Sequence, residues 1–210
     1  MWILPFFSAS EAGGGVMRAP AVVLFCAIGL SHIGFSQQTP TAPKKVLTPE
    51  QQAFREEMRV VGEKRDSLRA KAHQAFDAEM AQQKAGDCPN AENTYEFGIC
   101  FGKAAGVADQ NLKAYEEAIR DLLGLKYPNL TGNSPTTGPA GPVLTPEESV
   151  AEFDRVEQLW HSYLDAAATA AFHQFGGGTG GPSFEMETHL RLVRSHMLEL
   201  NEIYDMLLRL

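Results

Sequence analysis

Histidines and carboxylates near the C-terminus are the residues whose types and spacing could bind a metal ion. Glu185 and His189 are one helical turn apart, and His196 and Glu199 are nearly so. A metal site needs three or four converging ligands with orienting partners, and one helix can present two of them. Because these side chains lie among charged neighbours on an expected solvent-exposed flank, we expect no metal site and no cofactor. The same interpretation applies to the other histidines beyond residue 36: His73, His161 and His173.

Motifs of the common enzyme classes are missing from the sequence. There is no H-E-x-x-H, no serine-nucleophile motif and no phosphate-binding glycine loop. The glycine-rich run 176–181 follows no strand and precedes no lysine, so we expect a flexible turn there. Adjacent acids such as Glu56 and Glu57 diverge by about 100° on a helix and are expected to be solvated. The sequence therefore predicts a protein that is not an enzyme and has no catalytic residues.

An apolar run of 15 residues, from Ala21 to Phe35, predicts export from the cytoplasm. It follows a short basic stretch, Met17-Arg18, and ends in small residues before a polar segment, which is typical of a signal peptide. We expect residues 1–36 to be the signal peptide, with cleavage near Ser36-Gln37 and Met17 as an alternative start. The expected location is the periplasm or the outside of the cell. No apolar run reaches the ~20 residues of a membrane span, so no transmembrane segment is expected in the mature chain.

The overall charge narrows the class of partner. The 210 residues include 18 Lys+Arg and 26 Asp+Glu, which gives a net charge of −8, and 44% of them are apolar. A duplex nucleic-acid binder needs a basic face, so nucleic acid is not an expected partner. The apolar content is too high for a wholly disordered chain.

Two cysteines, Cys88 and Cys100, remain after removal of the signal peptide. An even number of cysteines in an exported chain favours a disulfide. The eleven intervening residues are too many for a C-x-x-C redox pair, and the chain offers too few partners for a zinc site. We expect a Cys88–Cys100 disulfide that contributes about 3 kcal/mol, mainly by restricting the unfolded chain.

Apolar stripes with helical spacing predict an all-α fold of about four helices in two antiparallel hairpins. Residues 37–47 are an expected extended leader, 48–127 the first hairpin with the disulfide, 128–144 a Pro/Gly/Thr linker and 145–210 the second hairpin. Thr48 and Thr145 each precede a proline and a capping-box residue, Gln51 or Glu148, so both should begin helices. Asn93 should begin the second helix and Ser183 the last. Whether the two hairpins pack together stays open.

Four stripes define the expected buried faces of these helices. The first helix should end near Gly86, and the second near residues 127–128. In the third helix the stripe includes Val156, Trp160 and Tyr163, which we interpret as core positions. The remaining stripe positions are Phe54, Met58, Val61, Leu68, Ala72, Ala75 and Met80 in the first helix; Phe97, Phe101, Ala104, Ala108, Leu112, Tyr115, Ile119 and Leu122 in the second; Val150, Phe153, Ala167, Ala170 and Ala171 in the third; and Met186, Leu190, Val193, Met197, Leu200, Tyr204 and Leu207 in the last.

Residues 88–208 resemble the lysozyme-inhibitor LprI-like family of exported bacterial proteins. That family has two cysteines with eleven residues between them, a threonine six before the second and an Asp-x-x-Leu-x-x-Tyr run beyond it. The matching residues are Cys88, Thr94, Cys100, Asp109, Leu112 and Tyr115 in the first half, and Trp160, Tyr163, Asp165, Ala166, the turn 176–178, Leu192, Glu199 and Leu200 in the second. The chain departs from the family at four positions. The family has arginine where this chain has Leu164 and His196, and it has a second cysteine pair where this chain has Ala168 and Thr188.

The resemblance implies a non-catalytic envelope protein that inhibits a lysozyme-type muramidase. Such lysozymes are commonly basic, so the net charge of −8 would steer the encounter. The motif residues Thr94, Asp109, Leu112, Tyr115, Trp160 and Tyr163 are expected to be structural. A rigid projecting segment is needed to block a cleft, and the connection held by the two cysteines is our candidate. Its candidate contact residues are Asp87, Asn90, Glu92, Asn93 and Tyr95.

Two alternatives remain open. The run 47–51, Leu-Thr-Pro-Glu-Gln, is similar to the Leu-Thr-x-x-Gln signature of periplasmic chaperones of the Spy/CpxP type. The same five residues are also simply a well-capped helix start, and the acidic net charge disfavours a basic client-binding surface. The more distant alternative is a metal-binding helical protein.

Overall fold

The chain is all-α in its described part. The structure is a computed structural model that describes residues 47–128, 137–138, 141–142, 144–176 and 178–209. The expected signal peptide, nearly all of the leader and most of the linker lie outside these residues. The described elements are α1 (Pro49–Ala85), α2 (Thr94–Leu123), α3 (Pro146–His173), α4 (Gly181–Ile203) and α5 (Asp205–Leu208), with a two-residue antiparallel pairing of β1 (Thr137–Gly138) and β2 (Gly141–Pro142).

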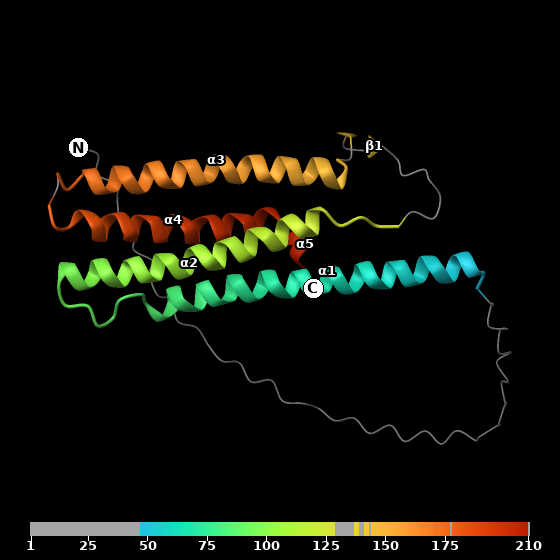
Figure 1. The fold of residues 1–210 in the computed structure, drawn as a ribbon, viewed down its shortest axis with the longest axis horizontal. Coiled ribbons are helices and arrows are strands. Elements are labelled where there is room, and N and C mark those ends of the chain that lie inside the picture. Colours follow the sequence, from blue (N-terminus) through green and yellow to red (C-terminus); the bar gives the residue numbers. More distant parts are fainter. Residues whose placement is uncertain (1–46, 129–136, 139–140, 143, 177, 210) are drawn as a thin grey trace, which may run out of the picture. The chain divides into compact units, whose positions relative to one another are not determined.

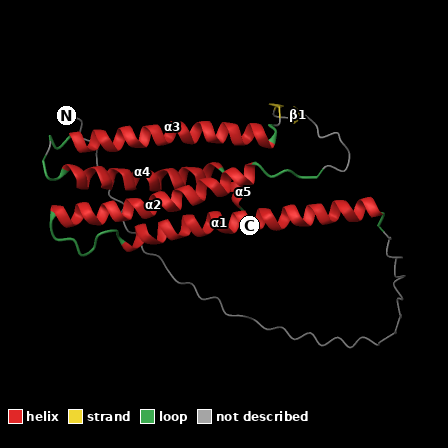
Figure 2. Ribbon diagram, viewed as in Figure 1, coloured by secondary structure: helices red, strands yellow, loops and turns green. Residues whose placement is uncertain are grey.

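Local capping explains where three of the long helices begin; the helices themselves are drawn in red in Figure 2. Thr48 and Thr145 each form the predicted capping box, with Gln51 and Glu148 respectively. Asn93 caps α2, because its side-chain oxygen accepts a hydrogen bond from the Glu96 amide at 3.0 Å. These three predicted helix starts are confirmed.

The two hairpins pack together through α2 and α4. In Figure 1, α1 lies beside α2, α2 beside α4, and α4 beside α3. The chain reverses between α1 and α2 and between α3 and α4, whereas α2 and α4 run in the same direction. Near their starts, the Ser183 hydroxyl donates to the Thr94 carbonyl at 3.0 Å, and towards their ends the Tyr115 hydroxyl donates to Asn201 at 3.2 Å.

The short α5 joins the end of the second hairpin to the first helix. Arg69 of α1 donates to the Leu207 carbonyl at 2.8 Å, and His73 donates to the Leu208 carbonyl at 2.9 Å. These bonds satisfy carbonyl groups at the end of α5 that have no partner inside the helix. The chain segments that they join are more than 130 residues apart in sequence.

The core lies along α2 and α4, as their uninterrupted stripes predict. The buried members of the α2 stripe are Ala104, Ala108, Leu112, Tyr115, Ile119 and Leu122, and those of the α4 stripe are Leu190, Val193, Met197 and Leu200. By contrast, α1 contributes buried residues only from Ala72 onwards, and Met58 and Val60 near its start are exposed. No helix in the described ranges is both long and apolar enough to span a membrane.

The predicted core face of α3 is wrong at three positions. Val156 and Tyr163 are each more than half exposed, and Ala170 is exposed as well. Trp160 is half-buried against the core. The buried residues of this helix are Phe153, Glu157, Leu164, Ala168 and Ala171. The prediction followed the apolar residues Val156 and Tyr163, which face solvent, whereas the buried positions one residue further along hold Glu157 and Leu164.

Some helix ends also differ from prediction. The last long helix begins at Gly181 without a side-chain cap, because Ser183 bonds to α2 instead of capping α4. It ends at Ile203, and α5 follows after Tyr204. The second helix ends at Leu123, a few residues before the predicted end at 127–128.

Candidate functional site

The connection between α1 and α2 is held by the predicted cysteine pair. The Cys88 and Cys100 sulfurs lie at bonding distance, with Cα atoms 5.9 Å apart. Gly86 lets the chain leave α1 with a φ of 83°, a conformation that an L side chain rarely adopts. The pair attaches the connection to the second turn of α2.

A buried ion-pair network also holds this connection, through its residue Asp87. Arg194 of α4 donates to Glu79 of α1 at 2.7 Å and to both carboxylate oxygens of Asp87 at 2.5 and 2.6 Å. Asn111 of α2 donates to the second oxygen of Glu79 at 2.8 Å. Burial on its own would lower the pKa of Arg194, but the two carboxylates raise it above its ordinary value. Arg194 therefore stays charged.

Asp87 is consequently not a free contact residue, contrary to the prediction. Its carboxylate lies on Arg194, and its side chain is mostly buried. The other four candidates, Asn90, Glu92, Asn93 and Tyr95, are exposed, with Tyr95 at 78%. Asn93 uses its side chain to cap α2, which leaves Asn90, Glu92 and Tyr95 as outward-facing groups.

A shallow groove of about 430 Å³ lies next to this connection. Ile99 and Val107 are exposed apolar residues in its lining, and Glu96 and Lys103 line it as well. The amide of Glu92 donates to the Glu96 carboxylate at 2.8 Å, which ties the connection to the first turn of α2. The connection and the groove form one continuous surface with exposed aromatic, apolar and acidic groups.

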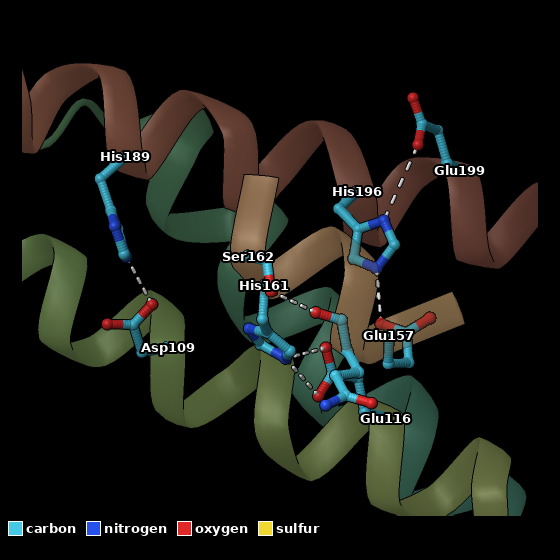
Figure 3. A network of polar contacts seen from close by, with 9 residues as sticks. Asp109, Glu116, Glu157, His161, Ser162, His189, His196 and Glu199 are labelled. Carbon is cyan, nitrogen blue, oxygen red and sulfur yellow. Dashed lines mark hydrogen bonds and ion pairs between the residues drawn. The ribbon is translucent and has the colours of Figure 1, made fainter. Parts of the chain in front are cut away.

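A second polar cluster lies where α2, α3 and α4 meet (Figure 3). Glu157 of α3 is buried, and its Oε2 accepts a hydrogen bond from Nε2 of His196 of α4 at 2.8 Å. Trp160 stacks on His196, with ring centroids 3.9 Å apart. His161 places Nε2 3.2 Å from Oε1 and 3.3 Å from Oε2 of Glu116 of α2. The expectation of a solvated His196 is therefore wrong, because this side chain is only 5% exposed.

The environment of Glu116 disfavours a negative charge. Burial raises its pKa to about 8, and the nearby Glu157 carboxylate adds to this effect, while His196 opposes it. The Oε1 atoms of Glu116 and Glu157 and Nδ1 of His196 are buried without a hydrogen-bond partner. The His196–Glu199 pair considered from the sequence is long, at 3.7 Å.

His189 pairs with α2 instead of with its helical neighbour Glu185. Its Nε2 lies 2.7 Å from the carboxylate of Asp109, and this bond raises the pKa of His189 above its ordinary value of 6.5. Leu112 and Tyr115 are core residues, and burial raises the pKa of the Tyr115 hydroxyl. Of the motif residues of α2, Leu112 and Tyr115 are therefore buried, whereas Thr94 and Asp109 are exposed.

Sequence reasoning missed four charged residues that hold the helices together: Glu79, Glu116, Glu157 and Arg194. A signal was present for two of them. Glu79 follows Ala72 and Ala75 on the buried face of α1, and Glu157 follows Phe153 on the buried face of α3. A charge on an apolar helical face indicates a buried polar partner on another element. The partners themselves lie on distant segments, and no local pattern marks them.

Comparison of the chain with protein-family models, with curated proteins and with solved structures finds no match.

Proposed function

We propose that this chain is a non-catalytic, exported binding protein that contacts a partner protein through the Cys88–Cys100 connection. The observation that supports this proposal is the combination of exposure and restraint in one segment. Asn90, Glu92 and Tyr95 face outwards, while the cysteine pair and the Asp87–Arg194 ion pair hold both ends of the segment. A segment that is already ordered loses little conformational entropy on binding, so more of its contact energy appears as affinity.

The resemblance to LprI-like proteins makes a lysozyme-type muramidase our proposed partner. Such enzymes are commonly basic, and a net charge of −8 would attract them over several ångströms of solvent. Glu92 and Glu96 place acidic groups next to the exposed ring of Tyr95. Exposed tyrosines supply large contact areas with few rotatable bonds, which suits the centre of an interface.

Lysozyme turnover in the presence of the purified protein tests this proposal. We expect dose-dependent inhibition that weakens with added salt and that falls by at least tenfold in Tyr95→Ala, about 1.4 kcal/mol of binding energy. Tyr127→Ala is the matched control, since Tyr127 is also exposed but lies beyond the opposite end of α2. Unchanged turnover at a large molar excess of the protein would reject the lysozyme partner.

Exposed apolar residues near the start of α1 favour a second candidate, a chaperone of the Spy/CpxP type. Val60 and Val61 line a shallow groove of about 410 Å³ with Tyr127, and Met58 is exposed nearby. An unfolded client could cover these residues. Suppression of client aggregation that is lost in Val60→Asp, without any lysozyme inhibition by the parent protein, would favour this candidate over the first.

A further inference from the structure

Three side chains of the second polar cluster converge from two helices. Glu157 and His161 are one turn apart on α3 and therefore project from the same side of that helix, towards Glu116 of α2 (Figure 3). One ligand atom from each of these three residues lies within 4.8 Å of the other two. The two carboxylates thus come together from different hairpins.

One oxygen of each carboxylate lacks a hydrogen-bond donor, although His161 and His196 contact the other oxygens. The Glu157 side chain is only 8% exposed, and its Oε1 and the Oε1 of Glu116 are both buried without a hydrogen-bond partner. Within the described residues no lysine or arginine pairs with either carboxylate: Arg120 binds Asp154 at 2.7 and 2.9 Å, and no ion pair joins Lys113 to them. A buried acceptor without a donor costs about 1–3 kcal/mol, and more when it is charged.

The surroundings of Glu157 already hold one of its oxygens in place. His196 bonds to Oε2, and Trp160 stacks on the His196 ring, so the orientation of the carboxylate is set by two neighbours. Metal-binding carboxylates are typically oriented by such hydrogen bonds from side chains that do not themselves touch the ion. The unpartnered Oε1 is left free for a ligand.

We propose that Glu116, Glu157 and His161 bind one divalent transition-metal ion, which links α2 of the first hairpin to α3 of the second. Two carboxylate oxygens and one imidazole nitrogen suit Zn²⁺ and its neighbours better than Mg²⁺ or Ca²⁺, which prefer oxygen ligands alone. The ion would neutralise both carboxylates and give their free oxygens a partner.

The three ligand atoms, which lie within 4.8 Å of one another, must move closer together to bind one ion. Bonds of about 2.0–2.2 Å place neighbouring ligand atoms of tetrahedral zinc roughly 3.3 Å apart. The His161 side chain is 48% exposed, so it can rotate towards the two carboxylates without disturbing the core. Three protein ligands leave a fourth position for water.

The sequence alone drew attention to two other pairs, Glu185 with His189 and His196 with Glu199. Glu185 and His189 do not converge on a common point, because His189 binds Asp109, and Glu199 is exposed at the edge of the cluster. The converging set instead combines a buried glutamate of α3 with a residue from the other hairpin. Spacing along one helix could not reveal it.

Zn²⁺ titration of the full chain, purified without a histidine tag and freed of metal with a chelator, tests the proposal. We expect one Zn²⁺ per chain by isothermal titration calorimetry, with at least tenfold weaker binding in His161→Asn and in Glu116→Gln. His173→Asn is the matched control, because His173 is an exposed histidine on the same helix and should bind Zn²⁺ no differently from the parent. Mg²⁺ should produce no comparable heat.

Co²⁺ provides an independent readout of the ligands. Its visible absorption spectrum should indicate mixed nitrogen and oxygen ligation in the parent chain and should change in His161→Asn. Since His161 is half exposed, this variant should keep its helical circular dichroism, and loss of binding would then reflect loss of a ligand. Absence of stoichiometric Zn²⁺ binding, or binding that His161→Asn leaves unchanged, would overturn the proposal.

Discussion

Replacement of Arg194 by methionine should destabilise the protein strongly. The guanidinium lies between Glu79, which is fully buried, and Asp87, so the variant would leave a buried carboxylate without its cation. Methionine fills a similar volume, and lost packing therefore contributes little to the expected effect.

The magnitude follows from the burial of Glu79. Removal of one partner of a buried ion pair typically costs about 3–5 kcal/mol, because the remaining charge loses both its counter-ion and its access to water. Asn111 still donates to Glu79 in the variant, which places the expected loss near the lower value, about 3 kcal/mol. Arg59→Met is the matched control: Arg59 binds Glu56 and Glu63 on the exposed side of α1, where ion pairs contribute little to stability.

Urea denaturation followed by far-ultraviolet circular dichroism measures both variants. A decrease of less than about 1 kcal/mol in the free energy of unfolding of Arg194→Met would refute the reasoning, because an unpaired buried carboxylate should destabilise the fold by more than that. The double variant Glu79→Met with Arg194→Met distinguishes the cause. It removes both the charge and its partner from the core, so it should recover much of the lost stability.

Three further predictions concern packing, backbone and charge. Ile119→Ala, at a fully buried position of α2, should cost about 2–5 kcal/mol in urea denaturation, and a loss below 1 kcal/mol would contradict its place in the core. Gly86→Ala should destabilise by about 1–2 kcal/mol because of its positive φ, whereas Gly62→Ala, inside α1 with open space around it, should stabilise by about 0.5–1 kcal/mol. Asp109→Asn should cost at most about 1 kcal/mol below pH 6.5, since the pair is partly exposed. This loss should fade as pH rises through the raised pKa of His189, and a loss that grows with pH would refute the assignment.

The features of the fold that could be predicted arise from interactions between residues that are close together in the sequence. Capping at Thr48, Asn93 and Thr145 is a local interaction, so those helix starts follow from the sequence alone. The stripe of α2 is likewise uninterrupted, and its buried face was predicted correctly from Ala104 onwards. The break at Tyr204 has no comparable local signal.

The candidate sites depend on pairs that are distant in sequence. Glu79 and Arg194 are 115 residues apart, and the charge of Glu79 on the buried face of α1 does not indicate where its partner lies. In α3, exposed Val156 and Tyr163 resemble core residues, whereas the true core position holds Glu157. The spacing of apolar residues shows which face of a helix is the more hydrophobic, but it does not show which face is buried. A prediction from spacing therefore fails for a helix that buries a charged residue.

The bonds from α1 to α5 have a consequence for the order of folding. All-helical proteins usually fold quickly because most of their contacts join residues that are close in sequence. Here Arg69 and His73 meet their carbonyl partners across 138 and 135 residues, so the middle of the first helix gains these contacts only after α5 has been positioned. We therefore expect these two contacts to form late in refolding, after the helices that bring α5 to α1 have packed.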